Sequence, residues 1–139
     1  MIIMSVDYGD ARTGIAICDK YETLAFPVCV IHEKDSSLLA EKIKSLAKEK
    51  KAELIVVGHP KNMDGSLGFK AKATSEFADV LKESLDMPVE LWDERLTTVS
   101  AHKVLNENNV RGKKRKNTVD AVAAVIILQD YLEYRKNIM

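Results

Sequence analysis

The order of apolar patterns along the 139-residue chain constrains the fold more than any single motif does. Three short strand-like runs fill the first third and are joined by turn-like stretches, which predicts an antiparallel meander. Helical and strand-like patterns alternate after that. The ranges predicted as strands are 2–6, 13–18, 24–32, 54–57 and 88–92. This order predicts an α/β fold with a mixed five-stranded sheet and helices on both of its faces.

Helical periodicity begins after Asp35, with Ser36 or Ser37 as the expected N-cap. Further helices are predicted at 69–85, at 97–105 and around 120–131, where the apolar spacing is most regular. The continuously apolar run at 54–57 is typical of a strand covered on both faces. A loop is expected from Gly58 to Gly68.

Size and charge limit the possible functions. A chain of this length fits one compact domain over residues 1–139. Its 21 basic and 21 acidic residues cancel, so only a local segregation of charge could attract a polyanion. No long apolar span or signal-peptide pattern is present, which predicts a cytoplasmic protein without membrane contact. Cys18 and Cys29 fall inside strand-like runs and are expected to be buried free thiols.

Asp7 closes the first predicted strand and is followed by Gly9 and Gly14. A carboxylate at a strand end, beside glycines that allow a phosphate backbone to approach, suits a metal or phosphate site. The alternative is that Asp7 simply initiates a turn.

A second candidate segment follows the apolar run at 54–57, where loops of open sheets often build sites. Lys61 and Asn62 are candidate substrate contacts there, and His59 is a candidate for proton transfer. The alternative is an ordinary turn rich in glycine, proline and asparagine, with an incidental histidine.

Two adjacent acids, Asp93 and Glu94, end the last predicted strand, and Arg95 follows them directly. Because side chains alternate along a strand, at most one of the two acids should point into a given site. Arg95 could bind phosphate or pair with a neighbouring carboxylate. The alternative is that the acids complement the positive end of a following helix.

Asp120 shares a helical stripe with Ala124, Ile127 and Tyr131, which predicts that it faces the sheet. An inward carboxylate is costly unless it is paired, hydrogen-bonded or bound to a metal ion. The alternative places Asp120 in the first helical turn, behind Asn117 or Thr118 as the cap.

A local cluster of positive charge precedes Asp120. Its members are Lys103, Arg111, Lys113, Lys114, Arg115 and Lys116. A basic segment beside a set of acids could hold a nucleic-acid backbone near metal ions. A solvated, flexible loop is the alternative.

Four segments together resemble the YqgF family: DYGDARTGIA from Asp7, GHPKNMDG from Gly58, DERLTT from Asp93 and VDAVAAVIILQDYL from Val119. Members of that family are described as Holliday junction resolvases and as pre-16S rRNA nucleases, and they have an RNase H-like fold.

The resemblance implies a metal-dependent endonuclease whose ligands would be Asp7, Asp120 and either Asp93 or Glu94. Two Mg²⁺ or Mn²⁺ ions would activate the attacking water and stabilise the leaving oxygen. Arg12, Lys61 and Arg95 would neutralise phosphate charge, and the products would carry a 5′-phosphate and a 3′-hydroxyl. The expected substrate is precursor 16S rRNA, with branched DNA as the alternative.

Two other classes compete with the nuclease. An ATP-binding fold of the actin and sugar-kinase type would also place an Asp-x-Gly turn after its first strand, but it needs two lobes, and this chain is too short for them. A non-catalytic nucleic-acid-binding module in RNA processing or transcription would retain the fold and the basic segment. Either a monomer or a homodimer is compatible with the sequence.

Overall fold

The computed structural model describes residues 1–60, 68–93 and 112–138, except for the side chains of 112–121 and 138. In chain order the elements are β1 (Ile3–Asp7), β2 (Arg12–Cys18), β3 (Ala25–His32), α1 (Ser36–Lys50), β4 (Leu54–His59), α2 (Phe69–Ser84), β5 (Val89–Asp93) and α4 (Gly112–Ile138). The helix predicted at 97–105 lies outside the described residues.

The strands form one five-stranded sheet in the order β3-β2-β1-β4-β5. Strand β1 pairs antiparallel with β2, and β2 pairs antiparallel with β3. On its other side β1 pairs in parallel with β4, which pairs in parallel with β5. The predicted mixed sheet is therefore confirmed. The carboxyl ends of β1, β4 and β5 meet at one end of the sheet, where β2 begins and β3 ends; we call this the carboxyl end of the sheet.

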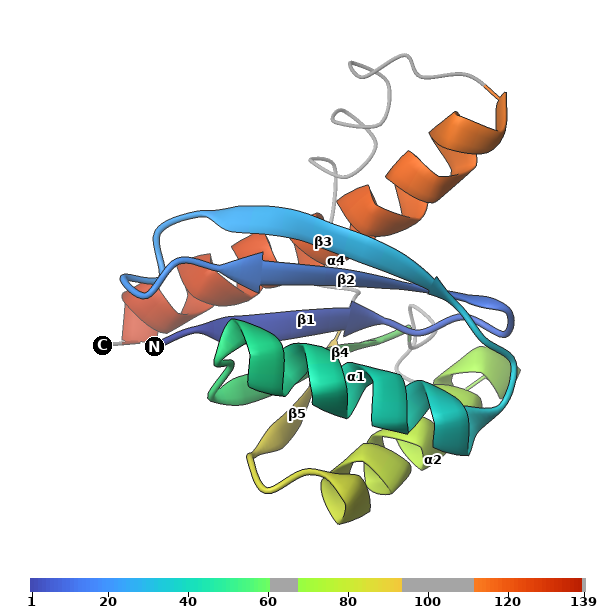
Figure 1. The fold of residues 1–139 in the computed structure, drawn as a ribbon. Coiled ribbons are helices and arrows are strands. Elements are labelled where there is room, and N and C mark those ends of the chain that lie inside the picture. The colour runs from blue at the N-terminus through green and yellow to red at the C-terminus, as the bar shows by residue number, and fades with distance from the viewer. Residues whose placement is uncertain (61–67, 94–111, 139) are drawn as a thin grey trace.

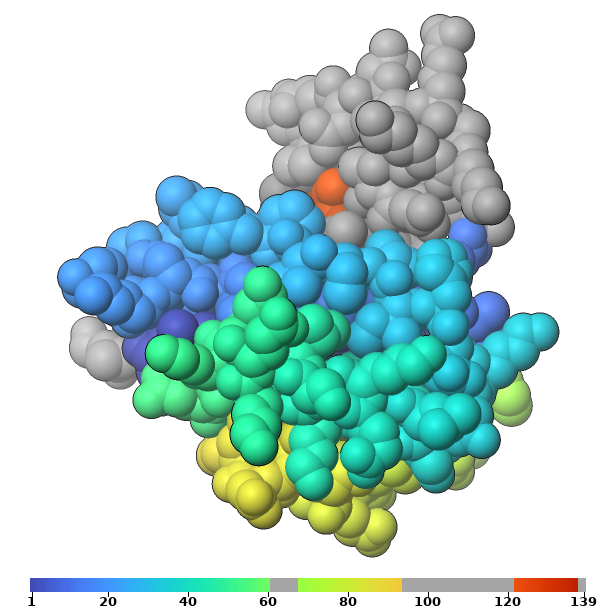
Figure 2. All heavy atoms as spheres, in the orientation of Figure 1, coloured from blue at the N-terminus to red at the C-terminus, as the bar shows by residue number. Residues whose placement is uncertain are grey.

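Helices cover both faces of the sheet, as predicted. In Figure 1, α1 lies in front of the sheet and α4 behind it. The front core joins Val6 and Val57 of the strands to Ile43 of α1 and Phe77 of α2. Figure 2 shows the side chains of α1 spread over this front face, below β3. The rear core joins alternate strand residues to α4; its buried members include Ile3, Ala16, Val56, Trp92, Ala124, Ile127, Leu128 and Leu132.

The start of α1 corrects one expectation. Its N-cap is Asp35, not Ser36 or Ser37. The Asp35 carboxylate accepts hydrogen bonds from the backbone N–H groups of Ser37 and Leu38 at 2.9 and 3.1 Å. A carboxylate satisfies these unpaired amides and also complements the positive end of the helix.

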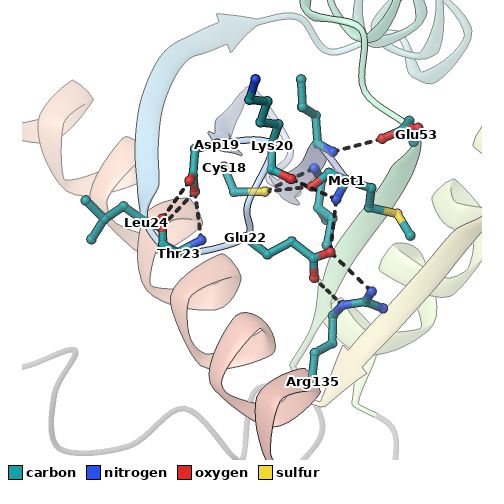
Figure 3. A network of polar contacts seen from close by, with 11 residues as sticks. Met1, Cys18, Asp19, Lys20, Glu22, Thr23, Leu24, Glu53 and Arg135 are labelled. Carbon is teal, nitrogen blue, oxygen red and sulfur yellow. Dashed lines mark hydrogen bonds and ion pairs between the residues drawn. The ribbon is translucent and has the colours of Figure 1, made fainter. Parts of the chain in front are cut away.

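A polar network joins the β2–β3 turn to the last turns of α4, at the end of the sheet opposite the carboxyl end (Figure 3). Glu22 accepts a hydrogen bond from Arg135 Nε at 2.6 Å and another from the Met1 ammonium at 3.0 Å. Within the turn, the Asp19 carboxylate accepts from the backbone N–H groups of Thr23 and Leu24. The C-terminal part of α4 is thereby held beside the beginning of β1.

Both cysteines are free thiols. Cys18 is buried as predicted, and its sulfur accepts a hydrogen bond from the Ile3 backbone N–H at 3.2 Å. Cys29 is only half-buried. Burial raises the pKa of both thiols, which keeps them protonated and unreactive at neutral pH. Within the described part of the chain, none of the helices is both long enough and apolar enough to span a membrane.

Replacing Arg135 with Gln should lower the free energy of unfolding, and by more at neutral than at acidic pH. Its hydrogen bond to Glu22 holds the pKa of that carboxyl below the ordinary value of 4.5. A depressed pKa stabilises the folded state above the unfolded pKa, and this contribution is lost as the pH falls through the folded value. We expect the variant to be less stable than wild type by about 1 kcal/mol at pH 7, because the pair is only partly buried.

Urea unfolding between pH 7 and pH 3 measures this difference, which should shrink below pH 4.5. Lys136→Gln is the matched control, since Lys136 approaches Glu133 only at 3.9 Å on the exposed side of the same helix. A stability difference that stays constant over the whole pH range would contradict the assignment to Glu22.

Candidate active site

Asp7 is the last residue of β1 and lies at the carboxyl end of the sheet. Its half-buried side chain lines a cavity of about 290 Å³. The other described residues of this cavity are Tyr8, Gly9, Asp10, Ala11, Arg12 and Lys70. A half-buried carboxylate in an open cavity is accessible to a cation while its position is held by the strand.

Glycines stand on both sides of Asp7 in the sheet. Gly14 of β2 is its partner in the antiparallel ladder. On the other side, Gly58 follows Val57, the β4 residue paired with Val6. Neither neighbouring strand therefore places a side chain beside the carboxylate, which leaves room for a ligand to reach it.

A third glycine shapes the β1–β2 turn. A Cβ atom on Gly9 would lie 2.3 Å from the carbonyl oxygen of Arg12, which is closer than any real Cβ contact. The turn can close over the cavity in this way only with glycine at this position. The backbone N–H of Gly9 points to Thr13 Oγ1 at 3.4 Å, so the turn is tied to the start of β2.

Alternation along β1 assigns Asp7 to the face covered by α4. Ile3 belongs to the rear core, and Ser5 donates a hydrogen bond from its hydroxyl to the Ala124 carbonyl of α4 at 2.7 Å. Met4 and Val6 belong to the front core. Asp7, two residues after Ser5, continues the series that faces α4.

Asp93 belongs to the opposite face. In β5, Val89 lies in the front core and Trp92 in the rear core. Asp93 therefore shares the parity of Val89 and is directed to the side of α2. Its partner in the ladder is His59, which also faces α2. Glu94, Arg95, Lys61 and Asn62 lie outside the described residues.

The backbone of Asp120 belongs to α4, one helical turn before Ala124. Arg135 lies beside the β2–β3 turn and Ala124 beside Ser5, so α4 runs antiparallel to β1. Four helix residues advance about 6 Å and two strand residues advance about 7 Å. The steps from Ala124 to Asp120 and from Ser5 to Asp7 are thus similar in length and direction.

The alternative interpretation of Asp120 as a first-turn residue was wrong. Helix α4 begins at Gly112, eight residues earlier, so neither Asn117 nor Thr118 is the cap. The basic residues Lys113, Lys114, Arg115 and Lys116 have helical backbone as well. They belong to the first turns of α4, whereas the alternative expectation for this basic cluster was a flexible loop. Lys103 and Arg111 lie outside the described residues.

His59 lies in β4 and not in a loop, because β4 extends two residues beyond the predicted strand. It is 5% exposed, and its Nε2 contacts the Ala71 carbonyl oxygen at 3.2 Å and Ser75 Oγ at 2.9 Å. A buried imidazole with both of these partners ties β4 to α2. His59 therefore has a structural role, and it lies on the face of the sheet opposite to Asp7.

The half-buried side chain of Arg12 lines the same cavity as Asp7, and its expected contact with substrate phosphate stays a prediction. Lys70 was missed, since nothing in the sequence brings the first turn of α2 next to the β1–β2 turn. Tyr8 also lines the cavity and stacks on Phe77 with 4.5 Å between ring centroids. Burial, reinforced by the carboxylates of Asp10 and Glu76, raises the pKa of Tyr8, so its hydroxyl stays neutral.

No group of three metal-ligating side chains occurs among the described residues. Asp7 and Asp93 belong to the described part of the chain, whereas Glu94 and the side chain of Asp120 lie outside it.

A family model described as "RuvX: Holliday junction resolvase" matches residues 1–134. The chain belongs to the RuvX (YqgF) family. A RuvX relative named "Putative pre-16S rRNA nuclease", from Halothermothrix orenii, is 51% identical over 138 residues, which is 99% of both chains. A relative of the same name from Desulfitobacterium hafniense is 44% identical over 96% of this chain and 93% of its own.

Solved structures show the same fold at low sequence identity. RuvC of Thermus thermophilus in complex with a Holliday junction substrate has a TM-score of 0.66 at 12% identity, covering 99% of this chain and 96% of that one. The fowlpox virus Holliday junction resolvase has a TM-score of 0.58 at 16% identity, covering 96% and 99%. The expected RNase H-like fold and the resemblance to the YqgF family are both confirmed.

Replacing Ser5 with Ala should test how α4 is held against β1 in this RuvX chain. The change removes the buried hydrogen bond to the Ala124 carbonyl and should lower the free energy of unfolding by about 1 kcal/mol. Ser45→Ala, at an exposed position of α1, is the control and should change stability by less than about 0.5 kcal/mol. Equal urea midpoints for the two variants would show that the Ser5 contact contributes nothing.

Proposed function

We propose that this chain is a metal-dependent endonuclease that hydrolyses phosphodiester bonds in nucleic acid at the carboxyl end of the sheet, on the face covered by α4. The observation that carries this proposal is the half-buried carboxylate of Asp7, held at a strand end between two glycine positions and facing α4. A carboxylate in this setting fits a hard divalent cation, which prefers oxygen ligands.

The ligands in this proposal are Asp7, Glu94 and Asp120. Glu94 is chosen over Asp93 because alternation directs Asp93 to the α2 face. Glu94 comes two residues after Trp92, which packs toward α4, and Asp7 also faces α4. Asp120 is included because α4 carries it one turn beyond Ala124, toward the end of β1. Asp93 is then a neighbour of the site and not a ligand.

Two Mg²⁺ or Mn²⁺ ions bound to these carboxylates would supply an activated water and stabilise the leaving oxygen. The protein's own contribution is charge and position. Arg12 and Lys70 line the Asp7 cavity and can bind the non-bridging phosphate oxygens. Further contacts are proposed for Lys61, Asn62 and Arg95, and for the basic first turns of α4, which contain Lys113, Lys114, Arg115 and Lys116.

Precursor 16S rRNA is the proposed substrate, supported by the name that relatives with 41–51% identity carry. Branched DNA is the second candidate, supported by the description of the RuvX family. In either case we propose a single nuclease domain over residues 1–139 that acts in the cytoplasm. It acts as a monomer or as a homodimer, and sedimentation with and without substrate distinguishes the two.

The choice between the adjacent acids gives a direct test. Glu94→Gln should lower the rate of cleavage at least about 100-fold, because even indirect partners of metal ligands cost 10- to 100-fold. Asp7→Asn and Asp120→Asn should have effects of the same size. Asp93→Asn, the matched control, should retain most of the activity. Single-turnover cleavage measures all four variants, and the reverse order for residues 93 and 94 would refute the parity argument.

Substrate and metal dependence can be tested in one comparison. Purified protein should cleave a precursor 16S rRNA fragment faster than a four-way DNA junction, with 5′-phosphate and 3′-hydroxyl products. EDTA should abolish cleavage, and Mg²⁺ or Mn²⁺ should restore it. Faster cleavage of the junction would favour the second candidate substrate. Binding without cleavage of either substrate, at any concentration of the two metals, would favour a non-catalytic module.

A further inference from the structure

We propose that Arg12, His32 and Lys34 form a phosphate-binding subsite that holds the nucleic-acid backbone beside the scissile phosphate. The inference rests on the proposed nuclease function and adds His32 and Lys34 to its substrate contacts. The ligand is a phosphodiester group that flanks the reacting one along the strand.

The register of the sheet brings two of these residues together. Arg12 and His32 are direct partners in the β2–β3 ladder. Directly opposite residues have Cβ atoms about 4.5–5.5 Å apart and share a face of the sheet. That face is the one covered by α4, because Ala16 of β2 belongs to the rear core while Ile31 of β3 belongs to the front core. Two donor side chains therefore lie side by side on the face of Asp7.

A cleft beside this pair shares lining residues with the Asp7 cavity. It has a volume of about 610 Å³, and its described lining residues are Ala11, Arg12, His32, Glu33 and Lys34. Ala11 and Arg12 line both this cleft and the Asp7 cavity. The two hollows therefore adjoin at the β1–β2 turn, and a strand of nucleic acid could pass from one to the other.

The charge in the cleft favours an anion. The only acid among its described lining residues, Glu33, accepts a hydrogen bond from Lys42 Nζ at 2.9 Å and another from the Asp35 backbone N–H at 3.2 Å. Its charge is thus already balanced within the protein. The exposed Lys34 adds a positive charge to the same cleft, and the guanidinium of Arg12 lines it with further N–H donors that suit phosphate oxygens.

The subsite is built on paired backbone. The Glu33 backbone N–H donates to the Ala11 carbonyl oxygen at 3.2 Å, which joins the end of β3 to the β1–β2 turn. Strand β3 lies two strands away from β1, a distance of roughly 10 Å. A group bound at His32 is therefore too far from Asp7 to be the reacting phosphate and suits a neighbouring one. Such a contact positions the substrate and carries no sequence information.

The test measures binding in a protein that cannot cleave. In an Asp7→Asn background, the affinity for a 5′-fluorescent single-stranded RNA that contains the cleavage site is measured by anisotropy. Lys34→Ala and His32→Ala should each weaken binding about tenfold, as expected for loss of a hydrogen bond to a charged group. The dependence of log K on log salt should become shallower by about one for Lys34→Ala. Lys48→Ala, an equally exposed lysine change in the last turn of α1, should leave the affinity and the salt slope unchanged.

Neutral methylphosphonate linkages, introduced one at a time, then locate the contact. One linkage beside the cleavage site should weaken binding about tenfold in the Asp7→Asn parent and have no effect in the His32→Ala/Lys34→Ala protein. If every neutral linkage costs the same in both proteins, or if Lys34→Ala binds as tightly as Lys48→Ala, the subsite does not exist. Cleavage by wild-type protein is measured separately: these losses of binding without any cleavage would overturn the nuclease proposal and leave the subsite standing, whereas cleavage without these losses of binding would overturn the subsite alone.

Discussion

The parallel pairing of β1 with β4 determines where the candidate functional groups lie. Because β1 is parallel to β4 and antiparallel to β2, the ends of β1, β4 and β5 come together with the start of β2 and the end of β3. Asp7 and Arg12 lie far in the sequence from His32 and Asp93, but all four residues belong to this one end of the sheet. A different partner for β1 would separate them, whatever their chemistry.

The opposite end of the sheet provides the anchor that this arrangement needs. Arg135, Glu22 and the first residue of β1 hold the last turns of α4 there, and Ser5 holds its middle. The backbone of α4 continues from Ala124 toward the carboxyl end of the sheet, so the direction of its earlier turns is set by contacts that lie farther along the helix.

Much of the fold could be predicted because its signals are local. The strands and helices within the described residues follow from apolar periodicity, and their order gives the sheet. Two boundaries failed for reasons that are not local. His59 reads as part of a glycine- and proline-containing turn, yet pairing with Asp93 and contact with α2 keep it in β4. The start of α4 was placed too late, because a run of lysine and arginine has good helix propensity but no apolar period.

The candidate site was predictable only in part, because the sequence identifies candidate residues but does not say which face of the sheet each side chain lies on. The position of Asp7 at the carboxyl end of the sheet could be predicted from its strand end, whereas the inward face expected for Asp120 stays a prediction because its side chain lies outside the described part of the chain. Lys70 and His32 could not be predicted, since their nearness to the β1–β2 turn depends on strand order and on where α2 begins. The role of Gly58 also depends on strand pairing. It follows Val57, the β4 residue paired with Val6, and so leaves space beside Asp7.

Asp93 and Glu94 illustrate what the packing of β5 adds to the information in the sequence. Alternation along a strand implies that only one of Asp93 and Glu94 faces a given site, but it does not say which of the two. The cores on either side of the sheet break this symmetry, because Trp92 packs toward α4 and Val89 toward α2. Asp93 then stands beside a buried histidine that is already engaged with α2. The other face of the sheet is the one on which Asp7 has glycine on both sides, and the backbone of α4 places Asp120 one helical turn beyond Ala124 on that face.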